Sequence, residues 1–464
     1  MSLVTANRQH AIVLGGSMSG LLTACVLSKY FERVTIIEKD RVNHQPESRP
    51  GQPQTRHLHA LLAMGLKIMT DYFPDLPQAL TDNGAVFVDL IEDMHWYTYG
   101  GYRQRFVSSL RGAAMSRPLL EHLLRERVLA LPQVELIDLA TVKQLVTTSE
   151  GDAPKETLCE RVMGVIVERH QSALTSVSLS ADLVVDATGR NSHTPQWLRD
   201  LGYESPLESK VEVNVGYATR LYRRNPYDPH SQTLFFYTPE APKEHHFGGM
   251  FPIEEERWMV ALGSWHNDSP PVDDHGFLEF ARGLPCSDIY NIISQSEPLS
   301  EIIPFKFPFS LRRHYEQLSR FPLGYLVLGD AACSFNPTYG QGMTVAALEA
   351  VELDRLLAEN PAPERLAQTF FRRITKIIDI PWQLAVGEDF RFPQTTGLKP
   401  PGIDLINRYI GLVHRVSQRD RIVCEAFYKV ANLIAPPSSL FHPRILWRVL
   451  RDFQIKNHSN CGSG

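Results

Sequence analysis

A strand, glycine turn and helix near the N-terminus constrain the fold of this chain more than any other feature. Residues 11–15 are apolar throughout, as expected of a buried parallel strand. The turn after them carries Gly15-x-Ser17-x-x-Gly20, and a second apolar strand downstream ends at Glu38. In a βαβ unit of this pattern, the helix N-terminus receives a pyrophosphate and the acid receives ribose hydroxyls. The pattern predicts a parallel α/β sheet with a dinucleotide site.

A second glycine-rich segment, far downstream, indicates which dinucleotide is bound. A predicted buried strand ends in Gly329-Asp330 and exposes a carboxylate there. Such a carboxylate can accept hydrogen bonds from a ribityl chain, which only a flavin has. The turn Pro337-x-x-Gly340-x-Gly342-Met343 then begins a helix, whose N–H groups and positive dipole end can face the flavin ring where negative charge develops. These residues predict FAD.

The amino-acid composition argues against several classes of function. The 464 residues carry a formal net charge of only −5 without a basic block, so we expect no nucleic-acid partner. Six scattered cysteines lack metal-ligand spacing, and no carboxylate or cysteine completes a set with His57 and His59, so we expect no metal. No apolar run approaches the roughly 18 residues of a membrane helix, and no basic segment marks a secretory signal. We expect a cytoplasmic protein without an integral membrane segment.

The order of segments predicts an α/β fold with insertions. Two strand-rich blocks, 85–107 and 208–266, alternate with period two, which is typical of an antiparallel sheet. We predict a Rossmann-type FAD-binding domain with an inserted, mostly antiparallel β-sheet substrate domain and a C-terminal helical region. The expected parts are FAD-binding at 1–84, 111–204 and 301–360, substrate sheet at 85–110 and 205–300, and helices at 361–464.

Other segments supply further candidates for the dinucleotide site. Arg117 begins a predicted helix that Ser116 caps, where its guanidinium can pair with a phosphate; an ordinary surface arginine is the alternative. Residues 41–57 form a polar, Pro- and Gly-rich loop of a length that is often functional. The predicted cofactor-binding residues are Gly15, Ser17, Met18, Ser19, Gly20, Glu38, Lys39, Arg56, Arg117, Asp330, Pro337, Gly340, Gly342 and Met343.

Aromatic residues of the two strand blocks suggest an apolar substrate cavity. Trp96 and Tyr217 are candidates for its wall, although strand aromatics are often ordinary core. Few cationic anchors stand among them besides Arg103, Arg105 and Arg220. A bulky apolar molecule fits such a cavity better than a small aromatic acid, which needs an arginine clamp.

Together, the glycine turn, Gly329-Asp330 and the turn at 337–343 resemble the FAD-dependent aromatic hydroxylase and epoxidase superfamily, with the fold of para-hydroxybenzoate hydroxylase. The resemblance covers roughly residues 8–360. The runs 49–59, 216–221 and 252–260 look most like the polyene epoxidases of bacterial polyether pathways. It implies a monooxygenase in natural-product biosynthesis, in which a flavin C4a-hydroperoxide inserts one atom of O2 into an alkene or hydroxylates the substrate. The flavin does the chemistry, so no catalytic side chain is certain; the candidates are His59, near the flavin, and Tyr217 and Trp96.

The superfamily's third fingerprint is incomplete, which bears on the electron source. The run Asp182-Leu-Val-Val-Asp186-Ala-Thr-Gly189 has Thr188 in place of an aspartate, and Pro195 stands where an arginine is expected. The resemblance therefore implies NAD(P)H as a slow direct reductant or a partner flavin reductase.

Several alternatives stay open. A flavin halogenase would carry Trp-x-Trp-x-Ile-Pro, which is absent. A prenyl reductase, such as geranylgeranyl reductase, shares the fold but saturates alkenes, and a flavin-binding scaffold would not turn over. The basic, amphipathic run 440–451 is either a helix that covers the core or a site of peripheral membrane contact.

Overall fold

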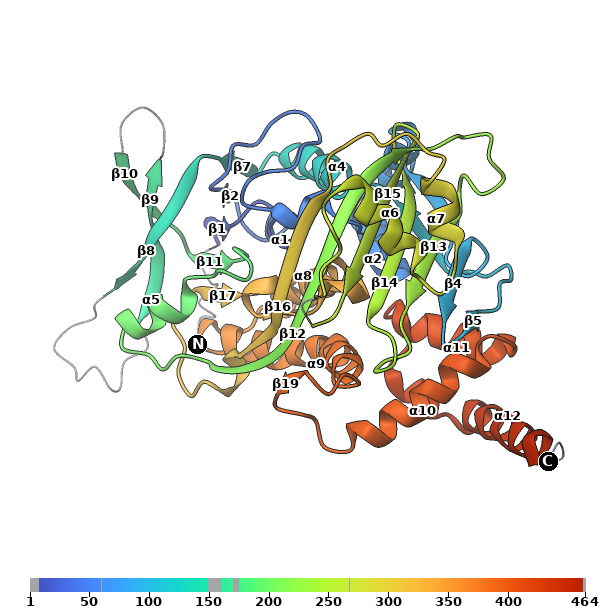
Figure 1. Ribbon diagram of the computed structural model, residues 1–464. Helices are drawn as coiled ribbons and strands as arrows, with labels where there is room; N and C mark the ends of the chain where they lie inside the picture. The colour runs from blue at the N-terminus through green and yellow to red at the C-terminus, as the bar shows by residue number, and fades with distance from the viewer. Residues whose placement is uncertain (1–7, 60, 149–159, 170–174, 267, 462–464) are drawn as a thin grey trace.

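The structure, a computed structural model, describes residues 8–59, 61–148, 160–169, 175–266 and 268–461 (Figure 1). The N-terminal unit has the predicted form, β1 (His10–Leu14), α1 (Met18–Leu27) and β2 (Arg33–Ile37). Every residue of β1 is buried, which explains its unbroken apolar run. β1 is the middle strand of a five-stranded parallel sheet, in the order β17-β11-β1-β2-β7. The other strands are β7 (Val134–Ile137), β11 (Leu183–Asp186) and β17 (Tyr325–Val327).

This topology brings distant predicted site residues to one edge. The carboxyl ends of parallel strands meet at the same edge of a sheet, where open α/β sheets bind ligands. Gly15 follows β1, Glu38 follows β2 and Gly329 follows β17 shortly downstream. The glycine turn, the ribose acid and the Gly-Asp segment therefore share one edge.

A larger sheet lies beside the parallel one (Figure 1). It has nine strands, in the order β18-β16-β12-β15-β14-β13-β4-β5, with β19 paired to β12. Its pairs are antiparallel except β13 with β4, so the predicted mostly antiparallel sheet is confirmed. The strands are β4 (Met94–Thr98), β5 (Gly101–Tyr102), β12 (Leu207–Arg223), β13 (Leu234–Thr238), β14 (His246–Ile253), β15 (Arg257–Ser264), β16 (Ile303–His314), β18 (Cys333–Ser334) and β19 (Thr396–Gly397).

Some strands fall elsewhere than expected. β16 belongs to the large sheet, so we propose that the predicted boundary at residue 300 lies nearer 314. β3 (Val86–Asp89) and β6 (Arg111–Ala114) form a two-stranded sheet of their own. Of the strands between 134 and 187, only β7 and β11 join the parallel sheet. The others make a separate antiparallel sheet of β8 (Ala140–Thr148), β9 (Arg161–Arg169) and β10 (Thr175–Ser180).

Helices cover the parallel sheet and close the molecule at its C-terminal end. α8 (Gly342–Ala358) packs against α1, α2 (Ala63–Tyr72) and α9 (Pro363–Asp389). α2 begins at Ala63, two residues after Leu61, which forms a bridge with Ala113. α4 (Arg117–Leu129) begins as predicted, and the Ser116 side chain accepts from the Leu119 N–H. Shorter helices are α3 (Leu76–Asp82), α5 (Thr194–Asp200), α6 (Asp274–Arg282) and α7 (Asp288–Ile293).

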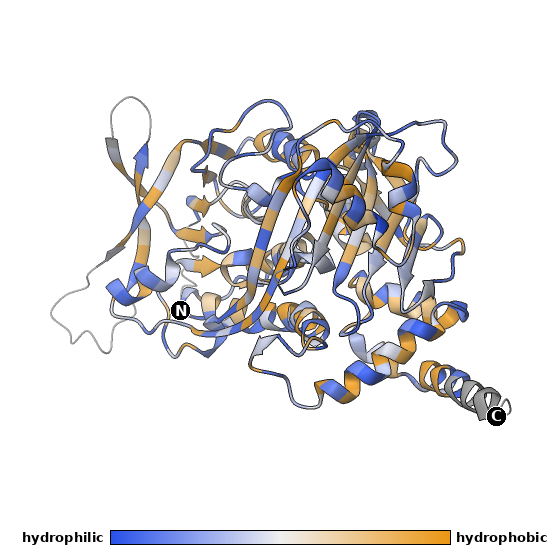
Figure 2. Cartoon of the chain, in the orientation of Figure 1, coloured by the Kyte–Doolittle hydropathy of each residue, from blue (hydrophilic) through white to orange (hydrophobic). Residues whose placement is uncertain are grey.

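The C-terminal region is helical, as predicted, with α10 (Ile403–Val416), α11 (Arg421–Ala431) and α12 (Pro443–Cys461). Figure 1 shows α12 projecting from the body. Figure 2 shows hydrophobic residues along the strands of the parallel sheet and polar residues on the outer turns. Across the described ranges, no helix is both long and apolar enough to span a bilayer.

Candidate active site

Packing of the glycine turn explains two of its glycines. Gly15 has φ of +96°, and a Cβ there would lie 2.7 Å from the Ala187 carbonyl oxygen. A Cβ at Gly20 would lie 1.8 Å from the Gly15 carbonyl oxygen. α1 therefore approaches β1 closely, and its first N–H groups, at Met18 and Ser19, have no acceptor within the helix. The turn presents a helix N-terminus suited to an anion.

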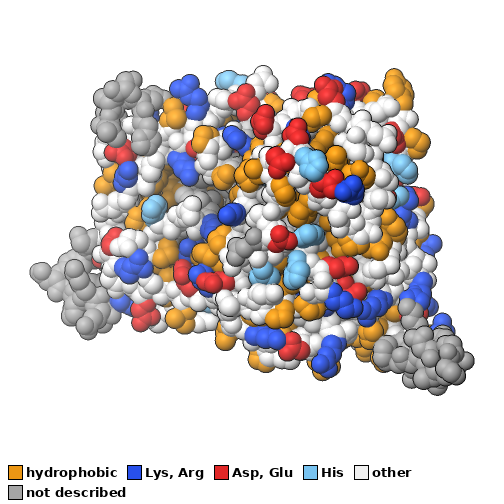
Figure 3. Space-filling view, in the orientation of Figure 1, with side chains coloured by type: hydrophobic (Ala, Val, Ile, Leu, Met, Phe, Trp, Pro, Cys, Tyr) orange, Lys and Arg blue, Asp and Glu red, His pale blue; other side chains and the backbone are white. Residues whose placement is uncertain are grey.

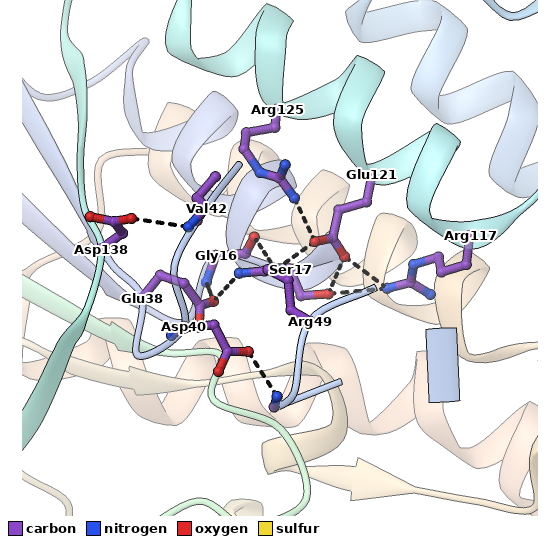
Figure 4. Close-up of polar contacts among 11 residues, drawn as sticks. Gly16, Ser17, Glu38, Asp40, Val42, Arg49, Arg117, Glu121, Arg125 and Asp138 are labelled. Carbon is purple, nitrogen blue, oxygen red and sulfur yellow. Dashed lines mark hydrogen bonds and ion pairs between the residues drawn. The ribbon is translucent and has the colours of Figure 1, made fainter. Parts of the chain in front are cut away.

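An arginine cluster lies beside this turn (Figure 4). It consists of Arg49, Arg117 and Arg125, which all face the buried carboxylate of Glu121. Arg49 Nη2 lies 2.5 Å and Arg125 Nη2 lies 2.7 Å from Glu121 Oε1, and Arg117 Nη2 lies 3.7 Å from Oε2. Ser17 Oγ donates to Glu121 Oε2 (2.7 Å) and accepts from Arg117 Nη2 (3.1 Å). The cluster thus reaches the N-cap residue of α1.

The charges of the cluster do not cancel. Burial raises the pKa of Glu121, but the three guanidiniums lower it by more. The pKa of Glu121 is therefore below its ordinary value. Arg49 Nη1 also lies 3.1 Å from Glu38 Oε2. Asp330 also lies near Arg117 and Arg190, so four cations face the three carboxylates of Glu121, Glu38 and Asp330. The Nε atoms of Arg49, Arg117 and Arg125 are buried without a hydrogen-bond partner in the described structure. Since buried charge is costly unless paired, the cluster suits an additional anion.

Glu38 lies at the end of β2, next to the turn. Its Oε2 accepts from the Gly16 N–H (2.8 Å) and its Oε1 from the Asp40 N–H (3.0 Å). A carboxylate offers about four lone-pair positions, so acceptor capacity remains. An open pocket of about 320 Å³ lies just beyond, lined by Arg41, Val42, Asn43, His44, Asp138 and Leu139.

Asp330 lies beyond the end of β17 at the same edge. Its side chain is exposed, yet surrounding protein raises its pKa by desolvation, and Arg117 and Arg190 offset this only in part. Arg190 rests over the rings of Phe307 and Phe309, at 4.7 and 4.2 Å, and its Nη1 and Nη2 are buried without a described partner. Asp330 therefore offers an exposed carboxylate beside two guanidiniums.

The turn before α8 borders open space. Gly340 has φ of +68°, in the left-handed region that favours glycine. A Cβ at Gly342 would meet no atom within 4 Å, so packing against the protein does not require a glycine there. A glycine in such a place permits the close approach of a ligand. Pro337 begins the short 3-10 turn that precedes Gly340, and Met343 is the second residue of α8.

Two predicted histidines lie in the 53–59 loop and are neutral. His59 Nδ1 lies 2.8 Å from the His57 carbonyl oxygen, and burial, with Arg117 next, lowers its pKa to about 3. His57 Nδ1 shares a hydrogen bond with Thr219 Oγ1 (2.9 Å), and burial followed by the charge of Arg56 lowers its pKa to about 4. Arg56 and Lys39 themselves are exposed. His59 lies near Arg117 of the arginine cluster.

The two aromatic candidates lie in different clusters. The Tyr217 ring lies 5.0 Å from His57, 5.1 Å from Phe305 and 6.4 Å from Phe247, and burial raises its pKa. Phe247 continues this row to Trp265 at 5.0 Å. Trp96 instead contacts Phe236, Phe427 and Tyr428, and its Nε1 donates to Thr238 Oγ1 (2.8 Å). The structure brings Tyr217, but not Trp96, to His57.

Four residues of this site, Arg49, Glu121, Arg125 and Arg190, are not among those predicted from the sequence. A signal existed for two of them. Arg117, Glu121 and Arg125 recur every four residues, which places them on one face of α4. No local pattern links Arg49 to Glu121, since 72 residues separate them.

Comparisons with known proteins bear on the fold. No protein-family model matches the chain. Protein Rv3254 of Mycobacterium tuberculosis is 30% identical over 443 residues, which cover 92% of this chain and 90% of Rv3254. The flavin-dependent brominase Bmp2 superposes with a TM-score of 0.64 at 14% identity, over 97% of this chain and all of Bmp2. The oxygenase of 2-methyl-3-hydroxypyridine-5-carboxylic acid gives a TM-score of 0.56 at 16% identity, over 92% and 97% of the two chains. The fold is that of flavin-dependent monooxygenases and halogenases.

Proposed function

The chain belongs to the same family as protein Rv3254 of Mycobacterium tuberculosis, and on this premise we propose that it is an FAD-dependent monooxygenase. One observation carries the proposal, the incompletely neutralised arginine cluster beside the glycine turn. It lies at the sheet edge that also holds Glu38 and Asp330. Buried unpaired donors next to a helix N-terminus fit a diphosphate, and the two acids fit the hydroxyls on either side of it.

The residues present fit FAD along its length. The pocket at 41–44 and 138–139 would take the adenine, and Glu38 the ribose. The N–H groups of α1 and the arginine cluster would hold the diphosphate, Asp330 the ribityl chain, and the turn before α8 the ring. When bound, FAD supplies the oxygen chemistry, so the protein needs no nucleophile of its own.

The chain's own residues would exclude water and orient the substrate. His57 and His59 are neutral at neutral pH and the Tyr217 phenol stays protonated, so this wall carries no charge. The row from His57 through Tyr217 and Phe247 to Trp265 is aromatic. Such a wall favours a bulky apolar substrate over a charged one.

The three arginines of the aromatic strand blocks, Arg103, Arg105 and Arg220, are engaged. Arg220 Nη1 lies 2.9 Å from Asp274. Arg105 donates to the Glu92 carbonyl oxygen (2.6 Å), and Arg103 donates to Ser417 Oγ (2.5 Å) and contacts His414. We therefore propose that the substrate is a largely apolar intermediate of natural-product biosynthesis and that the reaction is epoxidation of an alkene, with hydroxylation as the next candidate.

The electron source is proposed from the third fingerprint. Thr188 Oγ1 donates to Asp186 Oδ1 (2.6 Å), so this threonine is held inside the βα turn. Pro195 lies in the first turn of α5. Because neither offers a charge to a second nucleotide, we propose a partner flavin reductase, with slow reduction by NAD(P)H alone.

A halogenase is the second candidate, because the fold likeness extends over all of Bmp2, a flavin-dependent brominase. The two activities and a reductase are separated in one experiment. FAD-loaded protein and a reductant are incubated under ¹⁸O₂ with polyenes, phenols and bromide, and products are read by mass. One labelled oxygen in a polyene supports epoxidation, label only in phenols indicates hydroxylation, bromine in a product indicates a halogenase, and saturation without label indicates a reductase.

Exposed residues of the C-terminal helix α12 suggest a contact with a membrane surface. On α12, Trp447 is 58% and Leu450 is 50% exposed, and Arg444 and Arg451 flank them. Exposed aromatic and basic residues on one helix favour an anionic membrane surface. Elsewhere, charges of both signs are interspersed over most of the face in Figure 3. We propose peripheral membrane contact of a cytoplasmic protein, and co-sedimentation with anionic but not zwitterionic vesicles, lost in Trp447→Ser, tests it.

A further inference from the structure

A buried carboxylate lies next to the turn that precedes α8. Asp389 is the last residue of α9, and its side chain is fully buried. Its Oδ1 accepts three hydrogen bonds, from Asn336 Nδ2 (2.9 Å), Tyr339 OH (2.9 Å) and Trp265 Nε1 (3.2 Å). Its Oδ2 has no partner among the described residues. One oxygen therefore collects all of the side-chain donors and the other collects none.

Stability does not explain an acid at this position. A carboxylate at a helix C-terminus faces the negative end of the helix dipole, and Glu388 precedes it. Burial raises the pKa of Asp389 to about 7 although the three hydrogen bonds lower it. An asparagine could accept the same three bonds through its amide oxygen without a charge, but its two N–H donors would then be buried where Oδ2 has no partner. The ionisable group points to a role other than packing.

The donors of Asp389 join the turn to the substrate wall. Asn336 and Tyr339 stand at the two ends of η4 (Pro337–Tyr339), and Asn336 Oδ1 also accepts from Thr338 Oγ1 (2.7 Å). Gly340 and the first residues of α8 follow directly. Trp265 belongs to the aromatic row that includes Tyr217 and Phe247. One carboxylate thus fixes the turn and the wall relative to each other.

We propose that Asp389 is a positioning residue that holds the turn 336–340, and with it the N-terminus of α8, more tightly when it is ionised. This role depends on the proposed function in one respect, because FAD would contact this turn. Hydrogen bonds to an ionised acceptor are roughly twice as strong as neutral ones. Ionisation therefore tightens the three bonds locally. It also lowers the stability of the whole protein as pH rises, since the unfolded chain ionises at lower pH than the folded one.

The neighbouring charged groups are few. Glu388 and Arg391 lie on the α9 side and pair with each other at 2.7 Å, and Tyr339 lies on the turn. On the sheet side, His245 and His266 pack on Phe392, which stacks on Trp265. His245→Gln removes one of these two imidazoles and serves as the matched control.

The test is hydrogen exchange of the segment 336–342 in the protein without FAD, corrected for intrinsic rates, at pH 6 and pH 8. In the wild type and His245→Gln, protection should rise about tenfold between these values. Asp389→Asn should keep the protection seen at pH 6 and show no rise. Tyr339→Phe, which removes one donor and keeps the charge, should show a smaller rise.

The same variants are then titrated with FAD at both pH values. Asp389→Asn should bind FAD with an affinity that no longer follows the wild-type pH profile. An undiminished rise of protection in Asp389→Asn, or none in the wild type, overturns the proposal. Failure of the wild type to bind FAD contradicts the proposed function alone, because the exchange measurement needs no ligand.

Discussion

At the scale of single residues, the site is defined by charges that the fold leaves partly unpaired. The exposed carboxylate of Asp330 lies near Arg117 and Arg190, and desolvation by the surrounding protein raises its pKa more than these two charges lower it. Its oxygens accept no hydrogen bond from another described residue, so they are open to a ligand.

Asp330→Ala should weaken FAD binding by about 1.5–3 kcal/mol, the usual contribution of charge-assisted hydrogen bonds, or roughly 10- to 150-fold. Flavin fluorescence titration measures it, with Asp182→Ala as a control on the same sheet. Asp182 accepts from the Gln9 and His10 N–H groups and lies away from the edge, so its loss should leave FAD affinity unchanged. Wild-type affinity in Asp330→Ala would show that the ribityl contact lies elsewhere.

Two arginines of α4 offer a matched comparison. Arg125 pairs with Glu121 in the interior, whereas the partner of Arg127, Asp75, is exposed. Arg125→Met should destabilise the protein by about 2–3 kcal/mol, because it leaves Glu121 with fewer buried partners. Arg127→Met should cost less than about 1 kcal/mol. Denaturant unfolding compares the two, and equal costs would contradict the described burial of the cluster.

At the scale of elements, the strand–turn–helix order of the N-terminal unit and the start of α4 could be predicted because local signals encode them. A strand buried on both faces is apolar throughout, and a serine at the N-cap position indicates the start of a helix. The β16 boundary and the contact between Arg49 and Glu121 could not be predicted. They depend on pairing between distant segments, which periodicity does not report.

The two glycine turns should respond in opposite ways to alanine. A Cβ at Gly20 would lie 1.8 Å from the Gly15 carbonyl oxygen, so Gly20→Ala should lower the melting temperature and abolish FAD binding together. A Cβ at Gly342 meets no protein atom within 4 Å, so Gly342→Ala should keep or slightly raise the melting temperature and weaken FAD binding. Thermal unfolding and FAD titration of both variants check this. Unchanged FAD affinity in Gly342→Ala would remove the turn before α8 from the site.

At the scale of the whole molecule, one parallel sheet carries the proposed cofactor edge and the nine-stranded sheet carries the aromatic wall, with α8 and the C-terminal helices beside both (Figure 1). Buried acids accompany this arrangement. Glu349 on α8 accepts from the Gly329 N–H (2.6 Å), and burial raises its pKa to about 8. In the folded protein, the Glu349 carboxyl group therefore favours its protonated form near neutral pH.

This burial predicts a pH dependence of stability. The unfolded chain ionises Glu349 near pH 4.5 and the folded chain near 8, so its contribution is complete below about pH 4.5 and is lost as pH rises to 8. Glu349→Gln should thus be more stable than the wild type at pH 8 by roughly 2–4 kcal/mol, with little difference at pH 4.5. Thermal unfolding at the two pH values measures it. A difference that does not change with pH would mean that Glu349 is ionised in the folded protein.

The most direct test of the central claim is the affinity of the cofactor-free protein for FAD and for FMN, measured by calorimetry under one buffer condition. FMN keeps the ring, the ribityl chain and one phosphate but lacks the adenosine and the second phosphate. Because the arginine cluster, the turn at Gly15 and Glu38 would contact those missing parts, FAD should bind at least about 100-fold more tightly than FMN. Equal affinities, or no binding of FAD, would contradict the assignment of this sheet edge as an FAD site.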